Sequence, residues 1–209
     1  MKGKYMSYIQ LKHTPILTQG SHHEYYRHPE SHGKCIRIAT DHDGQRSSNR
    51  EMTFIQLMRG RDRSTKTLPR FYGLIRTDLG LGYVYDFIEN YDGTPAPTLA
   101  DILSDERMLL EHVGIEKLKN LLTFLHEDII ENQIISTKMT PRKILFPKSS
   151  DSIIHIYLTE PLGSSALIPL EYISNYFALR KIHSKWEKLK EEALSCAEYD
   201  IVKDLIKGM

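Results

Sequence analysis

The sequence predicts an α+β fold with two lobes, a small β-rich lobe followed by a mostly helical one. Short β-type segments recur in residues 8–90, whereas the two longest helical patterns lie in residues 98–209. Residues 89–97 between them contain Asp92-Gly93 and two prolines, which favour turns and linkers. We therefore expect one domain over residues 1–209, with an N-lobe over about 8–90, a linker over 89–97 and a truncated C-lobe over about 98–209.

The composition is that of an ordinary globular protein, with 209 residues, 40% hydrophobic residues and a formal net charge of +1. A chain of this size buries roughly 70% of its unfolded surface, so it needs no disulfide or metal to fold. Without a clustered basic stripe we expect no nucleic-acid partner. Because no secretory signal or run of about 18 apolar residues occurs, we expect no membrane span. We interpret Cys35 and Cys196 as free thiols in the cytoplasm. Signal-independent export and the oligomeric state are left open.

Hydrophobic alternation and turn residues predict the strands of the first half. Ile9–Leu17 is typical of a short strand, and Cys35-Ile36-Arg37-Ile38 of a second. Phe71–Arg76 and Gly82–Ile88 predict a hairpin around Asp78-Leu79-Gly80. Cys35 has apolar neighbours, which favours a buried, inert thiol over a nucleophile.

A polar loop is expected over residues 41–49, and a short helix over Arg50–Met58 after it. The helix is predicted from apolar residues at helical spacing, namely Met52, Ile55 and Met58. Two adjacent histidines, His22 and His23, are interpreted as exposed loop residues, although one of them could contact an anion.

Helical spacing dominates the second half. Thr98 is a predicted helix cap, with Asp101 three residues later as in a capping box. Ile115–Gln133 is the strongest helix, and Leu170–Leu194 is a second long one, with Ile144–Phe146 and Ile153–Leu158 as short strands between them. Four aromatic residues of the last helix are expected to be packing residues: Tyr172, Tyr176, Phe177 and Trp186.

This order of elements resembles that of a protein kinase, and its motifs resemble the bacterial YrbL family, whose namesake belongs to the PhoP regulatory network. The resemblance runs from about Leu11 to about Lys190 and implies a minimal kinase-like two-lobe fold. The motifs that carry it are Leu68-Pro69-Arg70-Phe71-Tyr72-Gly73, Thr77 with Gly80, Gly82-Tyr83-Val84-Tyr85-Asp86, Asp92-Gly93, Pro141 with Ile144-Leu145, Leu162-Gly163, Leu167-Ile168-Pro169-Leu170, and Leu179-Arg180-Lys181 with Trp186.

In the N-lobe, the resemblance assigns three residues to a nucleotide or phosphate site. Gly20 is the remaining glycine of the loop that covers the phosphates in a kinase, and Thr18 stands where a first glycine would be. Arg37 replaces the strand lysine, and Glu51 is its expected helix partner. Two interpretations of Arg37 have equal weight: an ion pair that joins strand to helix, and a phosphate contact.

In the C-lobe, the resemblance places Lys138 at the catalytic aspartate, Lys143 at the metal-binding asparagine and Glu160 at the second metal-binding aspartate. A protonated lysine can neither accept a proton nor bind magnesium, whereas a glutamate could hold the metal. Lys138 and Lys143 are therefore candidates for binding a phosphate or carboxylate, or are simply solvated surface lysines.

The expected function is that of a pseudokinase, which acts by binding a protein partner or a small anion and needs no cofactor. The alternative is an active phosphotransferase that uses ATP and magnesium on a small molecule, a surface carbohydrate or a protein. Glu160 would then hold the metal, and Glu51 or Asp86 would replace the base. A third possibility is a homologue that works through protein contacts alone.

Overall fold

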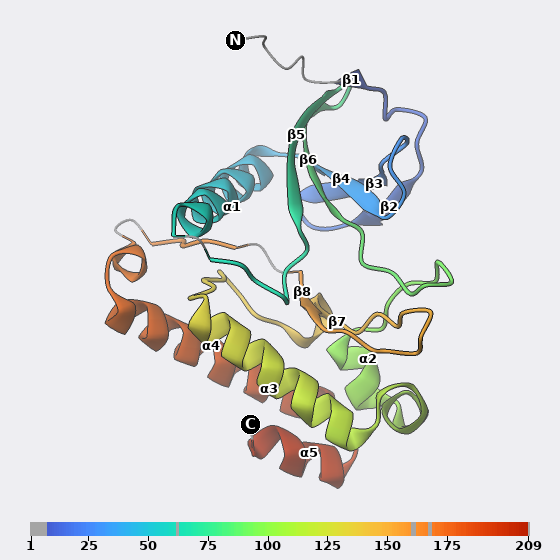
Figure 1. Ribbon diagram of the computed structural model, residues 1–209, viewed down its shortest axis with the longest axis vertical. Helices are drawn as coiled ribbons and strands as arrows, with labels where there is room; N and C mark the ends of the chain where they lie inside the picture. The colour runs from blue at the N-terminus through green and yellow to red at the C-terminus, as the bar shows by residue number, and fades with distance from the viewer. Residues whose placement is uncertain (1–7, 62, 160–161, 167–168, 209) are drawn as a thin grey trace. The chain divides into compact units, whose positions relative to one another are not determined.

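The computed structural model describes residues 8–61, 63–159, 162–166 and 169–208, and has a mixed α+β architecture (Figure 1). The chain divides into two compact units. The first unit consists of the residues up to Asn49 together with Pro69–Ile88, and the second of Arg50–Leu68 together with the residues from Glu89 onward. None of the described helices is long and apolar enough to span a membrane.

The first unit is built on a six-stranded sheet with the order β1-β5-β6-β4-β3-β2. β1 pairs with β5 in parallel, and all other pairs are antiparallel. Ile36, Ile75 and Val84 lie on one face with other apolar side chains and form the core of this unit. The strands are β1 (Tyr8–Ile9), β2 (Ile16–Gln19), β3 (His23–Arg27), β4 (Lys34–Ala39), β5 (Phe71–Thr77) and β6 (Gly80–Asp86).

The chain from residue 9 to residue 17 is not the single strand that the sequence predicted. It forms β1, then a turn, then β2. The turn is fixed because the carboxylate of Asp78 accepts hydrogen bonds from the backbone N–H groups of Leu11 and Lys12, at 2.6 and 3.1 Å. The strand prediction from hydrophobic alternation could not include this contact, which joins residues 66 and 67 positions apart.

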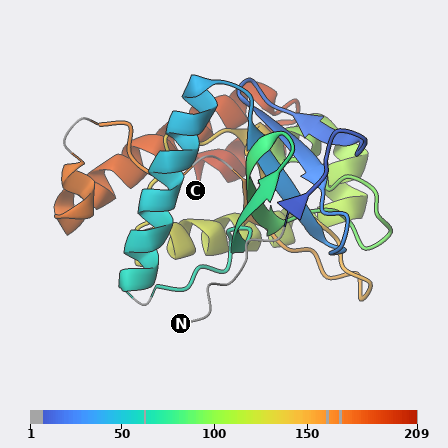
Figure 2. The same ribbon diagram turned by 90° about the horizontal axis from the view of Figure 1, so that it is seen from above.

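Helix α1 (His42–Gly60) is longer than predicted, and the polar loop expected over residues 41–49 is wrong. The helix begins after Asp41, whose carboxylate accepts a hydrogen bond from Gly44 N at 2.8 Å and so supplies a helix cap. Figure 2 shows α1 as one continuous helix. Of the three predicted apolar positions only Met58 is buried, while Met52 and Ile55 are partly exposed. The other buried side chains of the helix are Ser47, Ser48, Glu51 and Phe54.

Two long helices supply most of the core of the second unit. α3 (Ile115–Glu131), where the sequence predicted its strongest helix, buries Leu118, Leu122, Leu125 and Ile129 at helical spacing. α4 (Asn175–Cys196) buries one face that includes Ile182, Trp186 and Leu189. The shorter elements are α2 (Leu99–Ser104), η1 (Met108–Val113), η2 (Pro141–Lys143), β7 (Ile144–Leu145), β8 (Tyr157–Leu158), η3 (Leu170–Tyr172) and α5 (Asp200–Lys207).

The capping box predicted at Thr98 is confirmed, because Thr98 and Asp101 exchange side-chain-to-backbone hydrogen bonds at the start of α2. The helix predicted to begin at Leu170 instead begins at Asn175, after the single turn η3. The strand predicted over Ile153–Leu158 is reduced to β8. Strand β3 and helix α5 were not predicted, because each is short and carries no clear turn or cap signal.

A buried carboxylate fastens the segment after α1 to helix α3 within the second unit. Asp128, which is 5% exposed, accepts hydrogen bonds from the N–H and hydroxyl of Thr67 at 3.1 and 2.5 Å, and from Lys66 N at 3.2 Å. Asn132 Nδ2 adds a fourth donor at 2.9 Å. The guanidinium of Arg63 donates to the Asn132 carbonyl at 2.9 Å. These bonds satisfy the carboxylate, so its burial is not penalised as an unpaired charge would be.

Neighbouring isoleucines of α3 provide a matched test of this core. Ile129 is fully buried and Ile130 is 39% exposed. We expect Ile129→Ala to lower the free energy of unfolding by about 2–5 kcal/mol, because it leaves a cavity among packed side chains. Ile130→Ala should lower the free energy of unfolding by well under half of that amount. Urea unfolding followed by the fluorescence of Trp186, the one tryptophan, reports on this unit. Equal losses in the two variants would contradict the assigned helix face.

Candidate functional site

Arg37 lies on the face of the sheet opposite the apolar core, between two tyrosines. It pairs in register with Tyr83 of β6, and Tyr85 is the next residue along that face. Side chains at paired positions of neighbouring strands lie on one face, which brings these three together. The Arg37 guanidinium lies 5.5 Å from the Tyr83 ring centroid and 4.9 Å from that of Tyr85. Its Nη2 also donates to the Tyr85 hydroxyl at 3.2 Å.

The Arg37 side chain is 5% exposed, and Gln45 of α1 further encloses this face by donating to the Tyr83 hydroxyl at 3.0 Å. Cation–π contacts of this kind stabilise a buried arginine. Cys35, two residues before Arg37 on β4, is also buried, as predicted, and burial raises the pKa of its thiol to about 12. A thiol with that pKa is not a nucleophile at neutral pH.

Gly20 lies in the tight turn between β2 and β3, and its N–H donates to the carbonyl of His23 at 2.8 Å. A Cβ at this position would meet the His23 carbonyl oxygen at 3.7 Å, an ordinary contact, so the turn does not require glycine. Glycine is required instead at Gly44 of α1, which packs against this turn. A Cβ at Gly44 would lie 2.2 Å from the carbonyl oxygen of His22.

The two adjacent histidines differ in environment. His22 is exposed, and its Nδ1 lies 2.7 Å from Asp41 Oδ2, a hydrogen bond that raises the pKa of His22. The prediction that His23 is an exposed loop residue is wrong. It lies in β3, is 8% exposed, and its Nε2 lies 3.1 Å from the Gly44 carbonyl and 3.2 Å from the Ser48 hydroxyl. Burial, reinforced by the charge of Arg37, lowers the pKa of His23 to about 4.

Glu51 lies on the buried face of α1 and is 4% exposed. Its position on α1, nine residues after His42, places it in the second unit, whereas Gly20 and Arg37 belong to the first. Asp86, considered as a replacement base, is already engaged. Its Oδ2 accepts from Arg70 N at 2.9 Å and its Oδ1 from the Tyr72 hydroxyl at 2.8 Å.

Lys138 lies in the loop that leads to η2, with an exposed ammonium. Its Nζ is 3.8 Å from Glu192 Oε1 of α4, and both side chains are well solvated, so the pair contributes little to stability. The backbone of the loop is held more firmly. The Ser136 hydroxyl donates to the Lys138 carbonyl at 2.6 Å, and the Lys185 ammonium donates to the Thr137 carbonyl.

Within the second unit, the chain around this loop and η2 contacts Thr159 and Gly163. Lys143 is exposed, and its carbonyl accepts hydrogen bonds from the N–H and hydroxyl of Thr159 at 2.8 and 2.9 Å. Gly163 N donates to the Ile135 carbonyl at 2.7 Å. These bonds hold the backbone at Lys143 and Ile135 against Thr159 and Gly163, and the predicted metal ligand Glu160 lies outside the described residues.

The segment around Gly163 is fixed by close packing and by a buried ion pair. Gly163 has φ +102°, and a Cβ there would lie 2.8 Å from the Arg50 carbonyl oxygen, so glycine is required. Ser164 Oγ and the Lys181 ammonium both donate to the buried carboxylate of Glu171. Burial alone would raise the pKa of Glu171, but these two hydrogen bonds outweigh it and the pKa is lowered. Sequence reasoning missed this network because its members are not at a recognisable spacing.

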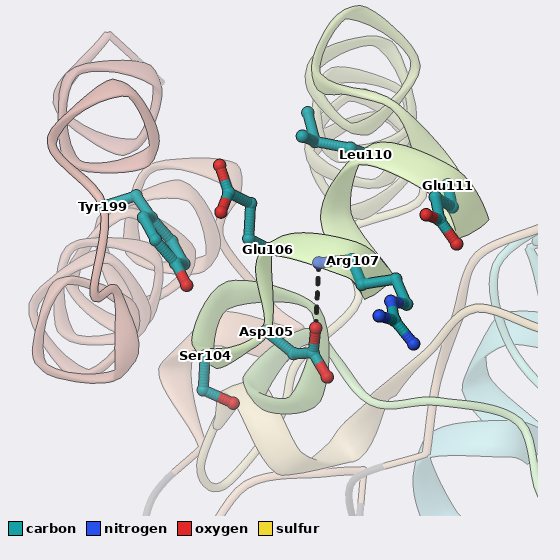
Figure 3. A pocket seen from close by; sticks show the side chains of 7 residues that line it. All are labelled: Ser104, Asp105, Glu106, Arg107, Leu110, Glu111 and Tyr199. Atoms are coloured by element: carbon teal, nitrogen blue, oxygen red, sulfur yellow. Dashed lines mark hydrogen bonds between the residues drawn. The ribbon is translucent and has the colours of Figure 1, made fainter.

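No group of three or more His, Cys, Asp or Glu that could hold a metal occurs among the described residues. A pocket of about 610 Å³ lies elsewhere in the second unit, and three of its seven lining residues carry carboxylates (Figure 3). One of them, Asp105, caps the following turn by accepting from Arg107 N at 2.9 Å. The lining residues are Ser104, Asp105, Glu106, Arg107, Leu110, Glu111 and Tyr199.

Comparison with known proteins identifies the relatives of this chain. Residues 9–193 match the family model described as PhoP regulatory network protein YrbL. The chain is 32% identical over 192 residues to the protein YrbL of Escherichia coli (strain K12), covering 90% of each chain. The YrbL protein of Shigella flexneri matches with the same identity and coverage.

Gly44 and Gly60 provide a matched test of the close approach between α1 and the turn. Gly60 ends the same helix and has open space around it. We expect Gly44→Ala to destabilise the protein by about 1 kcal/mol or more, because the methyl group overlaps a backbone oxygen that cannot rotate away. Gly60→Ala should be neutral or slightly stabilising, since alanine favours helix. Thermal unfolding followed by circular dichroism measures both. A Gly44→Ala protein as stable as the parent would contradict the contact.

His23 should make stability depend on pH. The pKa of His23 is about 4 in the folded protein and 6.5 when the side chain is not buried. As the pH falls, the unfolded chain is therefore protonated before the folded protein. The stability that neutral His23 contributes is therefore complete above pH 6.5 and is lost as the pH falls toward 4. His22 acts in the opposite direction, because its pKa is raised. Over this pH interval, urea unfolding of His23→Gln should show a smaller loss of the free energy of unfolding than the parent. The exposed-site control His13→Gln should lose as much as the parent. An unchanged pH slope in His23→Gln would refute the assignment.

Proposed function

The chain belongs to the YrbL family of PhoP regulatory network proteins, and from this premise we propose that it is a kinase-like protein that acts by binding, without magnesium-dependent phosphoryl transfer. The proposal has two parts: the relation to kinases, and the loss of their chemistry. Each is supported by different residues.

The order and pairing of elements support the relation to kinases. β2, β3 and β4 form three consecutive antiparallel strands, and the third carries Arg37 where a kinase carries its lysine. α1 follows directly and carries Glu51 on its buried face, where a kinase carries the partner glutamate. In the second unit, a loop that ends in Pro141 leads into the β7–β8 pair, and β8 leads toward Gly163.

The single observation that carries the second part is the state of Lys138. At the position of the catalytic base the chain has an exposed ammonium whose nearest partner is a carboxylate on α4. An ammonium has no lone pair with which to accept the proton of a substrate hydroxyl. Arg37 supports the same conclusion, because it is enclosed by tyrosine side chains of its own sheet and is not presented to solvent.

Binding a nucleotide or phosphate without metal fits the remaining charges better than transfer does. Lys138 and Lys143 are exposed cations on a loop whose backbone is held by Ser136 and Thr159. Two lysines where a kinase keeps an aspartate and an asparagine would repel magnesium and attract an anion. An active phosphotransferase would depend on Glu160 as its metal ligand.

Thermal unfolding with ATP or ADP, each with and without magnesium, tests the proposal, with inorganic phosphate as the control. We expect any stabilisation by nucleotide to be unchanged by magnesium, and no ADP to form from ATP. If the loop binds the anion, Lys143→Ala should remove the stabilisation. Arg142→Ala, which changes the exposed neighbour of Lys143 in η2, should leave the stabilisation in place. Magnesium-dependent ADP formation that is lost in Glu160→Ala would refute the proposal in favour of the active phosphotransferase.

A further inference from the structure

The start of α4 and the turn η3 before it expose a group of apolar side chains. Tyr176 and Phe177, which the sequence predicted to be packing residues, are 67% and 39% exposed, and Ile173 is 82% exposed. The rings of Tyr176 and Phe177 touch edge to face, with centroids 5.5 Å apart. We call this group the α4 apolar surface; its members are Leu170, Ile173, Tyr176, Phe177 and Leu179.

The backbone beneath this surface is fixed within the second unit. Tyr172 packs its ring beside Phe54 of α1, with centroids 6.4 Å apart, and its hydroxyl accepts from Ser164 N at 2.7 Å. Its carbonyl accepts from the guanidinium of Arg61. Because these contacts already order the backbone, a partner would lose less conformational entropy on binding here than on a flexible loop.

Within residues 169–180 the exposed charge is positive. Over residues 169–180 the charged residues are Glu171 and Arg180. Glu171 is buried and bonded to Lys181, so the acidic group is withdrawn from the surface, while Arg180 is exposed. Arg61 lies beside Tyr172, and the first turn of α4 contains no acidic residue. The positive end of the helix dipole adds to this field.

Aromatic side chains and arginine with few acidic residues are the composition of a protein–protein interface core. We propose that the α4 apolar surface binds an acidic, amphipathic segment of another protein, with apolar side chains on Ile173 and Tyr176 and carboxylates toward Arg180 and Arg61. Two copies of this chain meeting through the same surface would bring like charges together. An anionic membrane would gain only about 1 kcal/mol from each of these few cations. The surface contains neither Arg37 nor Lys138, so this inference goes beyond the proposed function and stands independently of nucleotide binding.

Binding of labelled synthetic peptides to the full chain, measured by fluorescence anisotropy, tests the inference. One peptide is an amphipathic helix with leucine and phenylalanine on one face and glutamate on the other, and its counterpart carries lysine in place of glutamate. We expect the glutamate peptide to bind, and Ile173→Ser and Tyr176→Ser each to weaken binding about tenfold. Arg180→Glu should weaken binding of the glutamate peptide and strengthen binding of the lysine peptide.

Tyr91→Ser is the matched control, because Tyr91 is also 67% exposed and lies in the same unit. It should leave binding unchanged. The inference is overturned if neither peptide binds, if both bind equally, or if Tyr91→Ser weakens binding as much as Tyr176→Ser. It is also overturned if sedimentation shows self-association that Ile173→Ser removes, or if the chain binds phosphatidylglycerol vesicles in preference to the glutamate peptide.

Discussion

The buried carboxylate of Asp128 is the constraint on which the second unit depends. It accepts hydrogen bonds from the backbone of Lys66 and from the backbone and hydroxyl of Thr67, so the segment that follows α1 is bound to α3. Thr67 in turn offers its carbonyl to Leu158 N at 2.8 Å, which extends the same chain of contacts to β8. One carboxylic side chain thus links a helix, a connecting segment and a strand pair. Its burial is tolerated because it accepts hydrogen bonds from several donors.

The sequence predicted the elements whose signals are local. The capping box of α2 and the apolar stripe of α3 both lie within single helices, where spacing alone decides the outcome. The start of α1 was missed because its signals point two ways. Asp41 caps the helix, but Gly44 inside its first turn suggested a loop. That glycine is present because the carbonyl of His22 approaches the helix closely, a contact between separate elements that a local pattern cannot contain.

The positions of the candidate site could be named from the resemblance, but their environments could not. For Arg37, the sequence left an ion pair and a phosphate contact as equal alternatives, and its tyrosine neighbours follow from the register of β4 against β6, which the sequence does not state. His22 and His23 were both predicted to be exposed loop residues, yet neighbouring residues of a strand face opposite ways, and His23 is buried. The exposure of Tyr176 and Phe177 was missed for a related reason. Residues at the start of a long amphipathic helix were assumed to share the packing of Trp186 farther along.

The polar groups of the protein are used mainly to fix loops. The carboxylates of Asp78, Asp86 and Glu171 each hold backbone or side-chain donors. Catalysis of phosphoryl transfer requires the opposite arrangement, in which a fixed backbone presents a carboxylate that is free to act. At Lys138 the loop backbone is fixed in this way, but the group it presents is an exposed cation. The loop contacts of Ser136 and Lys185 thus fix the backbone beside Lys138, while its charged group stays exposed.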